Sequence, residues 1–130
     1  MSDADIQRIL DELLRMFDLV GDREATGASL IMWKSRNLSF AKILATNPRL
    51  LLLDELFSKH SDPEARSVTA FINYAKAKGI GMLIAESGIK AEQALMLSDR
   101  GYVFANGRIV AEGTRDMLSA TPEAQIAINL

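Results

Sequence analysis

The chain has 130 residues, a net charge of −2 and no cysteine. Its length is that of one domain, and a domain of this size buries roughly two thirds of its unfolded surface. The slightly negative charge argues against nucleic acid and anionic membranes as partners. The lack of cysteine excludes disulfides, thiolate catalysis and cysteine-based zinc sites. We therefore expect residues 1–130 to form a single globular domain.

His60 is the only histidine, which excludes a multi-histidine metal site. The N-terminus is acidic and amphipathic, unlike a signal peptide. No apolar run approaches the ~20 residues that are needed to span a bilayer. These features predict a cytoplasmic protein without direct membrane insertion.

Two amphipathic helices are predicted in the first third of the chain. Apolar residues spaced by three and four predict a helix over 3–18, with Ser2 as its N-cap. Its apolar stripe consists of Ile6, Ile9, Leu10, Leu13, Leu14 and Phe17. A second helix is predicted over 30–46, and Asn47-Pro48 ends it. Its inward residues are Leu38, Ala41, Leu44 and Ala45.

Strands and helices alternate in the middle of the chain. The continuously apolar run RLLLLD predicts a strand near 50–54 that is buried on both faces. A helix follows, with Asp62 as N-cap, Pro63 at the first helical position and Gly79 beyond its end. Its buried stripe is Val68, Phe71, Ile72 and Ala75. A strand over 81–86 and a helix over 89–98 come next. The inward residues of that helix are Ile89, Ala91, Ala94 and Leu95.

The segment GYVFANGRIVAEG predicts a hairpin of strands 101–105 and 108–112. Asn106-Gly107 between them is the pair favoured in a type I′ turn. Thr114 and Thr121-Pro122 then begin two short helices. The alternation predicts a three-layer α/β fold with a small, mostly parallel sheet and an antiparallel hairpin at its edge.

Several segments resemble the C-terminal half of an ABC-transporter ATPase subunit of the branched-chain amino acid importer or lipopolysaccharide-export type. They are ATNPRLLLLDE, DPEAR, GIGMLIAE, SDRGYVFANGRIVAEGT and TPEAQIAINL. The resemblance runs from about Asp11 to the end of the chain. It implies a fold derived from P-loop NTPases, and an activity in which ATP hydrolysis drives a membrane partner.

The resemblance places two acidic residues in a nucleotide site. Asp54 matches the family's magnesium-binding Walker B aspartate and Glu55 its general base, whereas Leu56 replaces the usual proline. The phosphate loop G-x-x-x-x-G-K-[ST] does not occur in the sequence. That loop supplies the backbone N–H groups and the lysine that hold the β- and γ-phosphates.

Other parts of the family's site are replaced. The signature Leu-Ser-Gly-Gly-Gln is replaced by residues 30–34, Leu-Ile-Met-Trp-Lys, which cannot bring the backbone close to phosphate. The loop SKHSDP is one residue longer than expected, and Ser87-Gly88 stands where the switch histidine should be. His60 lies on a different loop. We therefore expect no catalysis, with Glu55 as a relic base and Asp54 as a relic metal ligand, and no cofactor. Two adjacent carboxylates alone bind magnesium weakly.

Two functions fit these replacements. The first is a repurposed or engineered structural or self-association module, in which Ile31, Met32, Trp33 and Phe40 either form an apolar partner or homodimer surface or fill space left by the missing half. The alternative is an ATP-binding fragment that uses Mg-ATP only with a partner that carries the phosphate loop. A transporter membrane subunit is a partner only under that alternative.

The resemblance also implies that a phosphate-loop strand is missing between strands 81–86 and 101–105. Buried unpaired backbone groups cost about 1–3 kcal/mol each. We therefore expect the gap to close into one sheet in the order 50–54, 81–86, 101–105, 108–112. The alternative is a strand-swapped or face-packed dimer, in which another chain supplies the pairing.

Overall fold

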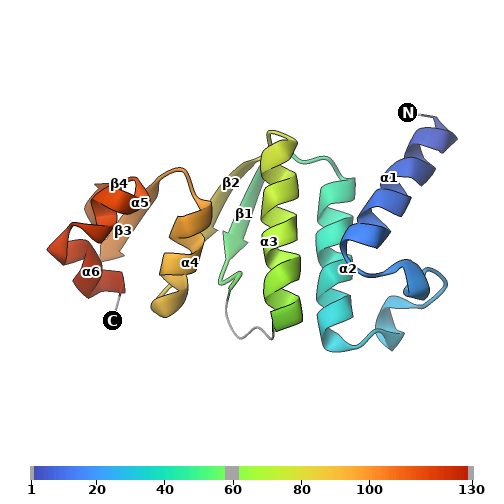
Figure 1. Ribbon diagram of the computed structural model, residues 1–130, viewed down its shortest axis with the longest axis horizontal. Helices are drawn as coiled ribbons and strands as arrows, with labels where there is room; N and C mark the ends of the chain where they lie inside the picture. The colour runs from blue at the N-terminus through green and yellow to red at the C-terminus, as the bar shows by residue number, and fades with distance from the viewer. Residues whose placement is uncertain (1, 58–61, 129–130) are drawn as a thin grey trace. The chain divides into compact units, whose positions relative to one another are not determined.

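The computed structural model describes residues 2–57 and 62–128. The chain divides into two compact units. The first unit comprises residues 1–51 with 60–81, and the second comprises residues 52–59 with 82–130. The elements of both units are labelled in Figure 1.

The first unit is helical. It contains α1 (Asp3–Met16), the 3-10 turns η1 (Val20–Asp22) and η2 (Gly27–Ser29), α2 (Met32–Ala45) and α3 (Asp62–Ala77). The helix α1 begins with a capping box, in which the Ser2 hydroxyl accepts from the Asp5 N–H and the Asp5 carboxylate accepts from the Ser2 N–H. The Ser2 hydroxyl and the Ser2 N–H both donate to the Asp5 carboxylate, and these two hydrogen bonds lower the pKa of Asp5. The three predicted helices of this unit are confirmed.

An aromatic cluster forms the core of the first unit. Phe40 of α2 stacks on Phe71 of α3, with ring centroids 4.5 Å apart, and lies 5.9 Å from Phe17 at the end of α1. The predicted stripe of α3 is confirmed, because Val68, Phe71, Ile72 and Ala75 are all fully buried. Phe17, Phe40 and Phe71 therefore join the three helices of this unit.

Part of the predicted apolar stripe of α1 is exposed. Leu13 and Phe17 are buried, but Ile6 and Leu10 are exposed because the first turns of α1 extend past α2 (Figure 1). Ala45 of α2 is also exposed, so its predicted inward position was wrong. Ala45 is the last residue of its helix, where fewer neighbours surround it.

The second unit is an α/β arrangement. Its elements are most of β1 (Leu50–Asp54) and β2 (Gly81–Ala85), then α4 (Ile89–Leu97), β3 (Gly101–Ala105), β4 (Arg108–Gly113), α5 (Arg115–Ser119) and α6 (Pro122–Ile128). The helices α5 and α6 pack on the β3–β4 hairpin around Val103, Leu118 and Ala124. Asn106 and Gly107 have φ values of 50° and 74°, which confirms the predicted type I′ turn.

The described strands form two separate two-stranded sheets, β1–β2 and β3–β4. The predicted α/β class, with a small parallel sheet and an antiparallel hairpin, is confirmed. The single closed sheet was wrong, because β2 and β3 do not pair. Alternate residues of both strands are exposed, and neither strand has a described strand partner at its second edge.

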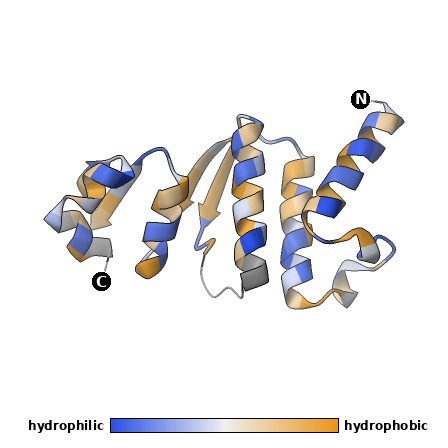
Figure 2. Ribbon diagram, viewed as in Figure 1, coloured by the Kyte–Doolittle hydropathy of each residue, from blue (hydrophilic) through white to orange (hydrophobic). Residues whose placement is uncertain are grey.

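The expectation that β1 is buried on both faces was also wrong. Leu51 is buried, but Leu50 and Leu52 are exposed, as is Ile89 at the start of α4. The residues of β1 before Asp54 are all apolar (Figure 2), and yet Leu52 is exposed. The strand β1 therefore has the apolar sequence of a buried strand but exposes the side chains of one face.

Among the described helices, none is long and apolar enough to cross a membrane. The longest of them, α3, has 16 residues and carries charged and polar side chains along its length. A spanning helix needs about 20 predominantly apolar residues.

Candidate functional site

An acidic pair stands at the end of β1. Asp54 is the last residue of the strand, and Glu55 follows with a left-handed φ of 49°. The Glu55 N–H donates to the carbonyl oxygen of Ala85 at 3.0 Å, so the turn out of β1 begins beside the end of β2. Both carboxylates are exposed. Carboxyl ends of parallel strands are where open α/β sheets bind ligands.

The turn after the acidic pair is held by core packing and by Glu86. Leu56 and Phe57 are buried, and the Phe57 N–H donates to Oε1 of Glu86 at 2.6 Å. The Glu86 carboxylate therefore accepts a structural hydrogen bond. Leu56, which stands where the resemblance expects proline, is a core residue. His60 lies outside the described residues.

Asp54 and Glu55 offer carboxylate oxygens to a magnesium ion, but a magnesium–nucleotide site also needs phosphate oxygens. Within residues 2–57 and 62–128, no three acidic or histidine side chains gather where they could hold a metal. Magnesium is normally held by one or two carboxylates together with phosphate oxygens and water. The phosphate ligands would need the glycine-rich loop, which the sequence lacks.

The segment that the resemblance places in the signature position forms the start of α2. Ile31 is the N-cap residue and makes no side-chain capping hydrogen bond, while Met32 follows with 87% of its surface exposed. Lys34 pairs with Asp22 of η1 at 2.5 Å, and this hydrogen bond raises the pKa of Lys34. The segment thus presents two apolar side chains and holds its lysine in an internal ion pair.

The predicted interaction surface is only partly exposed. Ile31 and Met32 are exposed, and Trp33 is half-buried. Phe40 does not belong to any surface, because it lies buried between Phe17 and Phe71. The prediction is therefore corrected for Phe40, whose position two turns further along α2 faces the other helices.

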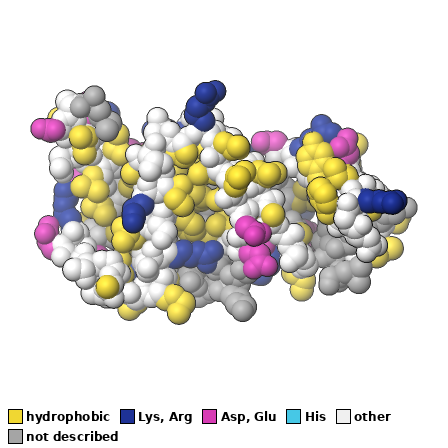
Figure 3. Space-filling model, turned by 180° about the vertical axis from the view of Figure 1, so that it is seen from behind, with side chains coloured by type: hydrophobic (Ala, Val, Ile, Leu, Met, Phe, Trp, Pro, Cys, Tyr) yellow, Lys and Arg dark blue, Asp and Glu magenta, His cyan; other side chains and the backbone are white. Residues whose placement is uncertain are grey.

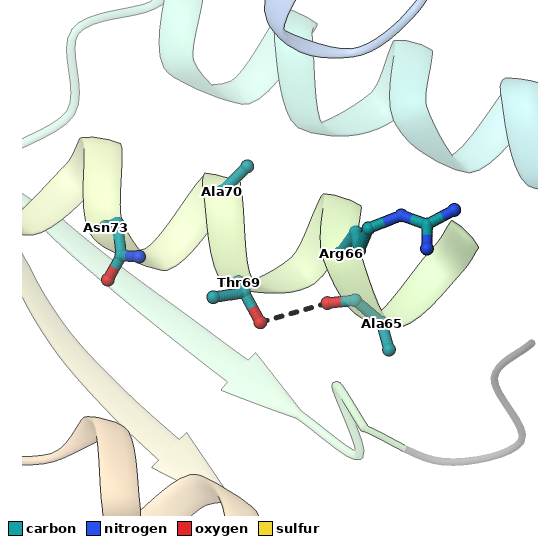
Figure 4. A pocket seen from close by; sticks show the side chains of 5 residues that line it. All are labelled: Ala65, Arg66, Thr69, Ala70 and Asn73. Atoms are coloured by element: carbon teal, nitrogen blue, oxygen red, sulfur yellow. Dashed lines mark hydrogen bonds between the residues drawn. The ribbon is translucent and has the colours of Figure 1, made fainter. Parts of the chain in front are cut away.

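Two hollows lie on the first unit. One, of about 290 Å³, is lined by Met16, Phe17, Asp18, Trp33, Asn37, Arg66, Ser67 and Ala70. The other is an open surface of α3 alone, lined by Ala65, Arg66, Thr69, Ala70 and Asn73 (Figure 4). The Thr69 hydroxyl donates to the Ala65 carbonyl at 3.0 Å, so it is already used within the helix. Neither hollow brings together groups that indicate a reaction.

Asn37 is the buried polar residue beside Trp33, and sequence reasoning missed it. Its Nδ2 donates to the carbonyl oxygen of Phe17 at 2.9 Å. Asn37→Ala leaves that buried carbonyl unpaired, so we expect the free energy of unfolding to fall by about 1–3 kcal/mol in urea titration. Ser35→Ala, at an exposed position of the same helix, is the control. Equal stability of the two variants would contradict this role of Asn37.

Comparison with known proteins points to one group. The sequence is 29% identical over 104 residues to the lipopolysaccharide export system ATP-binding protein LptB of Escherichia coli. The matched segment covers 80% of this chain and 42% of LptB. It is 28% identical over 116 residues to a probable ABC transporter ATP-binding protein of Azorhizobium caulinodans. This match covers 89% of this chain and 41% of that protein. No protein-family model matches the sequence.

Solved structures agree. An ATP-binding subunit of an ABC transporter superposes with a TM-score of 0.74 at 26% identity and covers 99% of this chain and 51% of that one. An ATP-binding cassette of an ABC transporter, in its ADP conformation, superposes with a TM-score of 0.75 at 22% identity. That match covers 98% of this chain and 51% of the other one. The fold is that of ABC transporter ATPase domains. The chain spans about half the length of these proteins.

Proposed function

We propose that this chain is a domain derived from ABC transporter ATP-binding proteins that, by itself, does not bind or hydrolyse ATP and acts by associating with protein. The observation that carries the proposal is the exposure of Ile31 and Met32 at the start of α2, the segment where the resemblance expects small phosphate-contacting residues. Bulky side chains there prevent the close approach of phosphate to backbone N–H groups. These are the replacements of a repurposed or engineered domain.

The acidic pair is the remaining catalytic feature. Without phosphate ligands, Asp54 and Glu55 supply two exposed carboxylates at a strand end, which hold magnesium weakly. Glu55 has no bound phosphate towards which it would direct water. We propose that both residues are relics in the chain as it stands.

Titration calorimetry with ATP, with and without magnesium, tests this proposal. The expected result is no heat of binding at millimolar nucleotide. Magnesium-dependent binding that is lost in Asp54→Ala and kept in Glu12→Ala, an exposed carboxylate on α1, would overturn it. That outcome would mean that the chain holds the phosphates by groups other than a glycine-rich loop.

A second function is favoured by the position of the acidic pair. Asp54 lies at the carboxyl end of β1 and on the same face as Leu52, two residues before it. A second polypeptide that carried a phosphate loop would place its phosphates at that end of the sheet. Under this alternative the chain is an ATP-binding fragment, Mg-ATP is its ligand, and a transporter membrane subunit is its eventual partner. This alternative predicts that a mixture of the two polypeptides binds nucleotide and that neither polypeptide binds it alone.

A further inference from the structure

The hollow of about 290 Å³ in the first unit lies where the end of α1, the first turns of α2 and the start of α3 meet. Its apolar wall consists of Met16, Phe17, Trp33 and Ala70. Sites for small molecules are mostly apolar hollows that carry a few polar groups, and their volumes begin at about 300 Å³. This hollow therefore has the size and the wall of a site for a small ligand.

Two contacts fix the wall of the hollow before any ligand binds. The buried Asn37 side chain donates to the Phe17 carbonyl oxygen at 2.9 Å, which holds the turn at the end of α1. The ammonium group of Lys34 lies 5.4 Å from the centre of the Trp33 ring, and its ion pair with Asp22 keeps it there. A ligand that enters this hollow has little protein to order, so less of its binding energy is lost.

Two charged side chains of opposite sign line the same hollow, Asp18 after α1 and Arg66 on α3. Neither side chain makes an ion pair or a hydrogen bond with another described residue. Asp18 also acts on Lys34 by its charge, but the hydrogen bond of Lys34 goes to Asp22. Figure 4 shows the Arg66 side chain extended towards the start of α3 and away from Thr69.

This pair of charges is a local feature. On the side seen in Figure 3, acidic and basic side chains are scattered and do not gather into a patch of one sign. Asp18 and Arg66 are both exposed, so they stand at the rim of the hollow, above its apolar wall. The hollow thus offers one negative and one positive group without a partner, beside an indole ring.

Opposite charges at one rim select a ligand that carries both signs. An anion such as phosphate would be repelled by the Asp18 carboxylate, and a simple cation would be repelled by the Arg66 guanidinium. A zwitterion satisfies both, because a guanidinium binds a carboxylate through two parallel hydrogen bonds and a carboxylate accepts from an ammonium group. A round hollow of 290 Å³ is about 8 Å across, which is the span of two such bonds of about 2.8 Å with an α-amino acid backbone between them.

We propose that this hollow binds a free α-amino acid with an apolar side chain. The α-carboxylate of the ligand pairs with Arg66, its α-ammonium group pairs with Asp18, and its side chain packs against Trp33 and Met16. The proposed function in protein association does not require such a site, so this inference goes beyond it and is tested separately.

Trp33 is the only tryptophan of the chain, so its fluorescence reports on the hollow directly. The full chain is titrated with L-phenylalanine and with L-methionine, and binding is followed by fluorescence and by calorimetry. We expect saturable binding with a Kd of about 1 mM, the scale for a small ligand in an open site. Two analogues, N-acetyl-L-phenylalanine without the ammonium group and L-phenylalanine amide without the carboxylate, should bind about tenfold more weakly.

Two variants identify the groups that bind the charges of the ligand. Arg66→Gln should weaken phenylalanine binding about tenfold and should remove the preference for phenylalanine over its amide. Asp18→Asn should weaken it similarly and should remove the preference over the N-acetyl analogue. Asparagine tolerates the left-handed φ of 53° at position 18, and both side chains are exposed, so each variant should keep the circular dichroism spectrum of the parent.

Arg49→Gln and Glu12→Gln are the matched controls. They remove the same charges at exposed positions of the first unit that do not line the hollow, and they should bind like the parent. The inference is overturned if neither method detects binding at ten times the expected Kd, or if Arg66→Gln binds phenylalanine as tightly as Arg49→Gln. It is also overturned if the amide binds as tightly as phenylalanine, because the amino end of a peptide would then be the occupant.

Discussion

Phe71→Ala is expected to lower the free energy of unfolding of the first unit by about 3–5 kcal/mol, the usual cost of removing a buried aromatic ring. Phe71 is fully buried, and its ring stacks on Phe40 at 4.5 Å. Phe40 in turn lies 5.9 Å from Phe17. Removing the central side chain of α3 therefore leaves a cavity that rigid neighbours cannot fill, and it ends a stacked aromatic contact.

Urea unfolding measures the change in stability, and amide exchange in α1, α2 and α3 shows where it occurs. Asn73→Ala is the control, because Asn73 lies on the same helix but is exposed, and it should change stability little. If Phe71→Ala and Asn73→Ala are equally stable, the aromatic cluster is not the core of this unit. A loss of the same size confined to β3 and β4 would contradict the division into units.

The elements were predictable because their signals are local. The helix of Asp62–Ala77 begins at the predicted start signal Asp62-Pro63, with Asp62 as its first helical residue rather than its N-cap, and ends before Gly79. The turn at Asn106-Gly107 has the two positive φ values that the pair favours. These features depend on neighbouring residues in sequence, whose chemistry is visible without a structure.

The exposure of side chains was less predictable, because it depends on the layers that are present. The apolar pattern of RLLLLD correctly indicates a strand, but the same pattern predicts burial of Leu52, which is exposed. Phe40 was predicted either to lie on a surface or to fill internal space, and stacking on Phe71 buries it. The sequence records which faces suit burial, and only the fold shows which of them are covered.

The candidate site also contains residues that could be predicted from the sequence and residues that could not. The resemblance singled out Asp54 and Glu55, and the structure places them at the end of β1. The hydrogen bond between the Phe57 N–H and Glu86 joins residues 29 apart, and no local pattern marks it. Asn37 is similar, because its partner is the backbone carbonyl of Phe17, which has no sequence signature.

Leu118→Ala is expected to destabilise the hairpin unit by about 2–5 kcal/mol. Leu118 of α5 is 1% exposed and packs with Val103 and Ala124, and this small cluster is the described core beneath the hairpin. A core with so few large side chains has little other apolar burial to offset the loss, since each buried leucine contributes about 1.5–3 kcal/mol. Amide exchange in β3 and β4 should accelerate accordingly.

Met117→Ala distinguishes loss of the core from loss of helix α5. Met117 precedes Leu118 in the same helix but is 60% exposed, so its removal should cost much less. If both variants lose equal protection in β3 and β4, the hairpin depends on α5 as a whole and not on the Leu118 contact. If Leu118→Ala alone releases the hairpin, the Leu118 contact holds it, and the exposed Phe104 side chain contributes little to its stability.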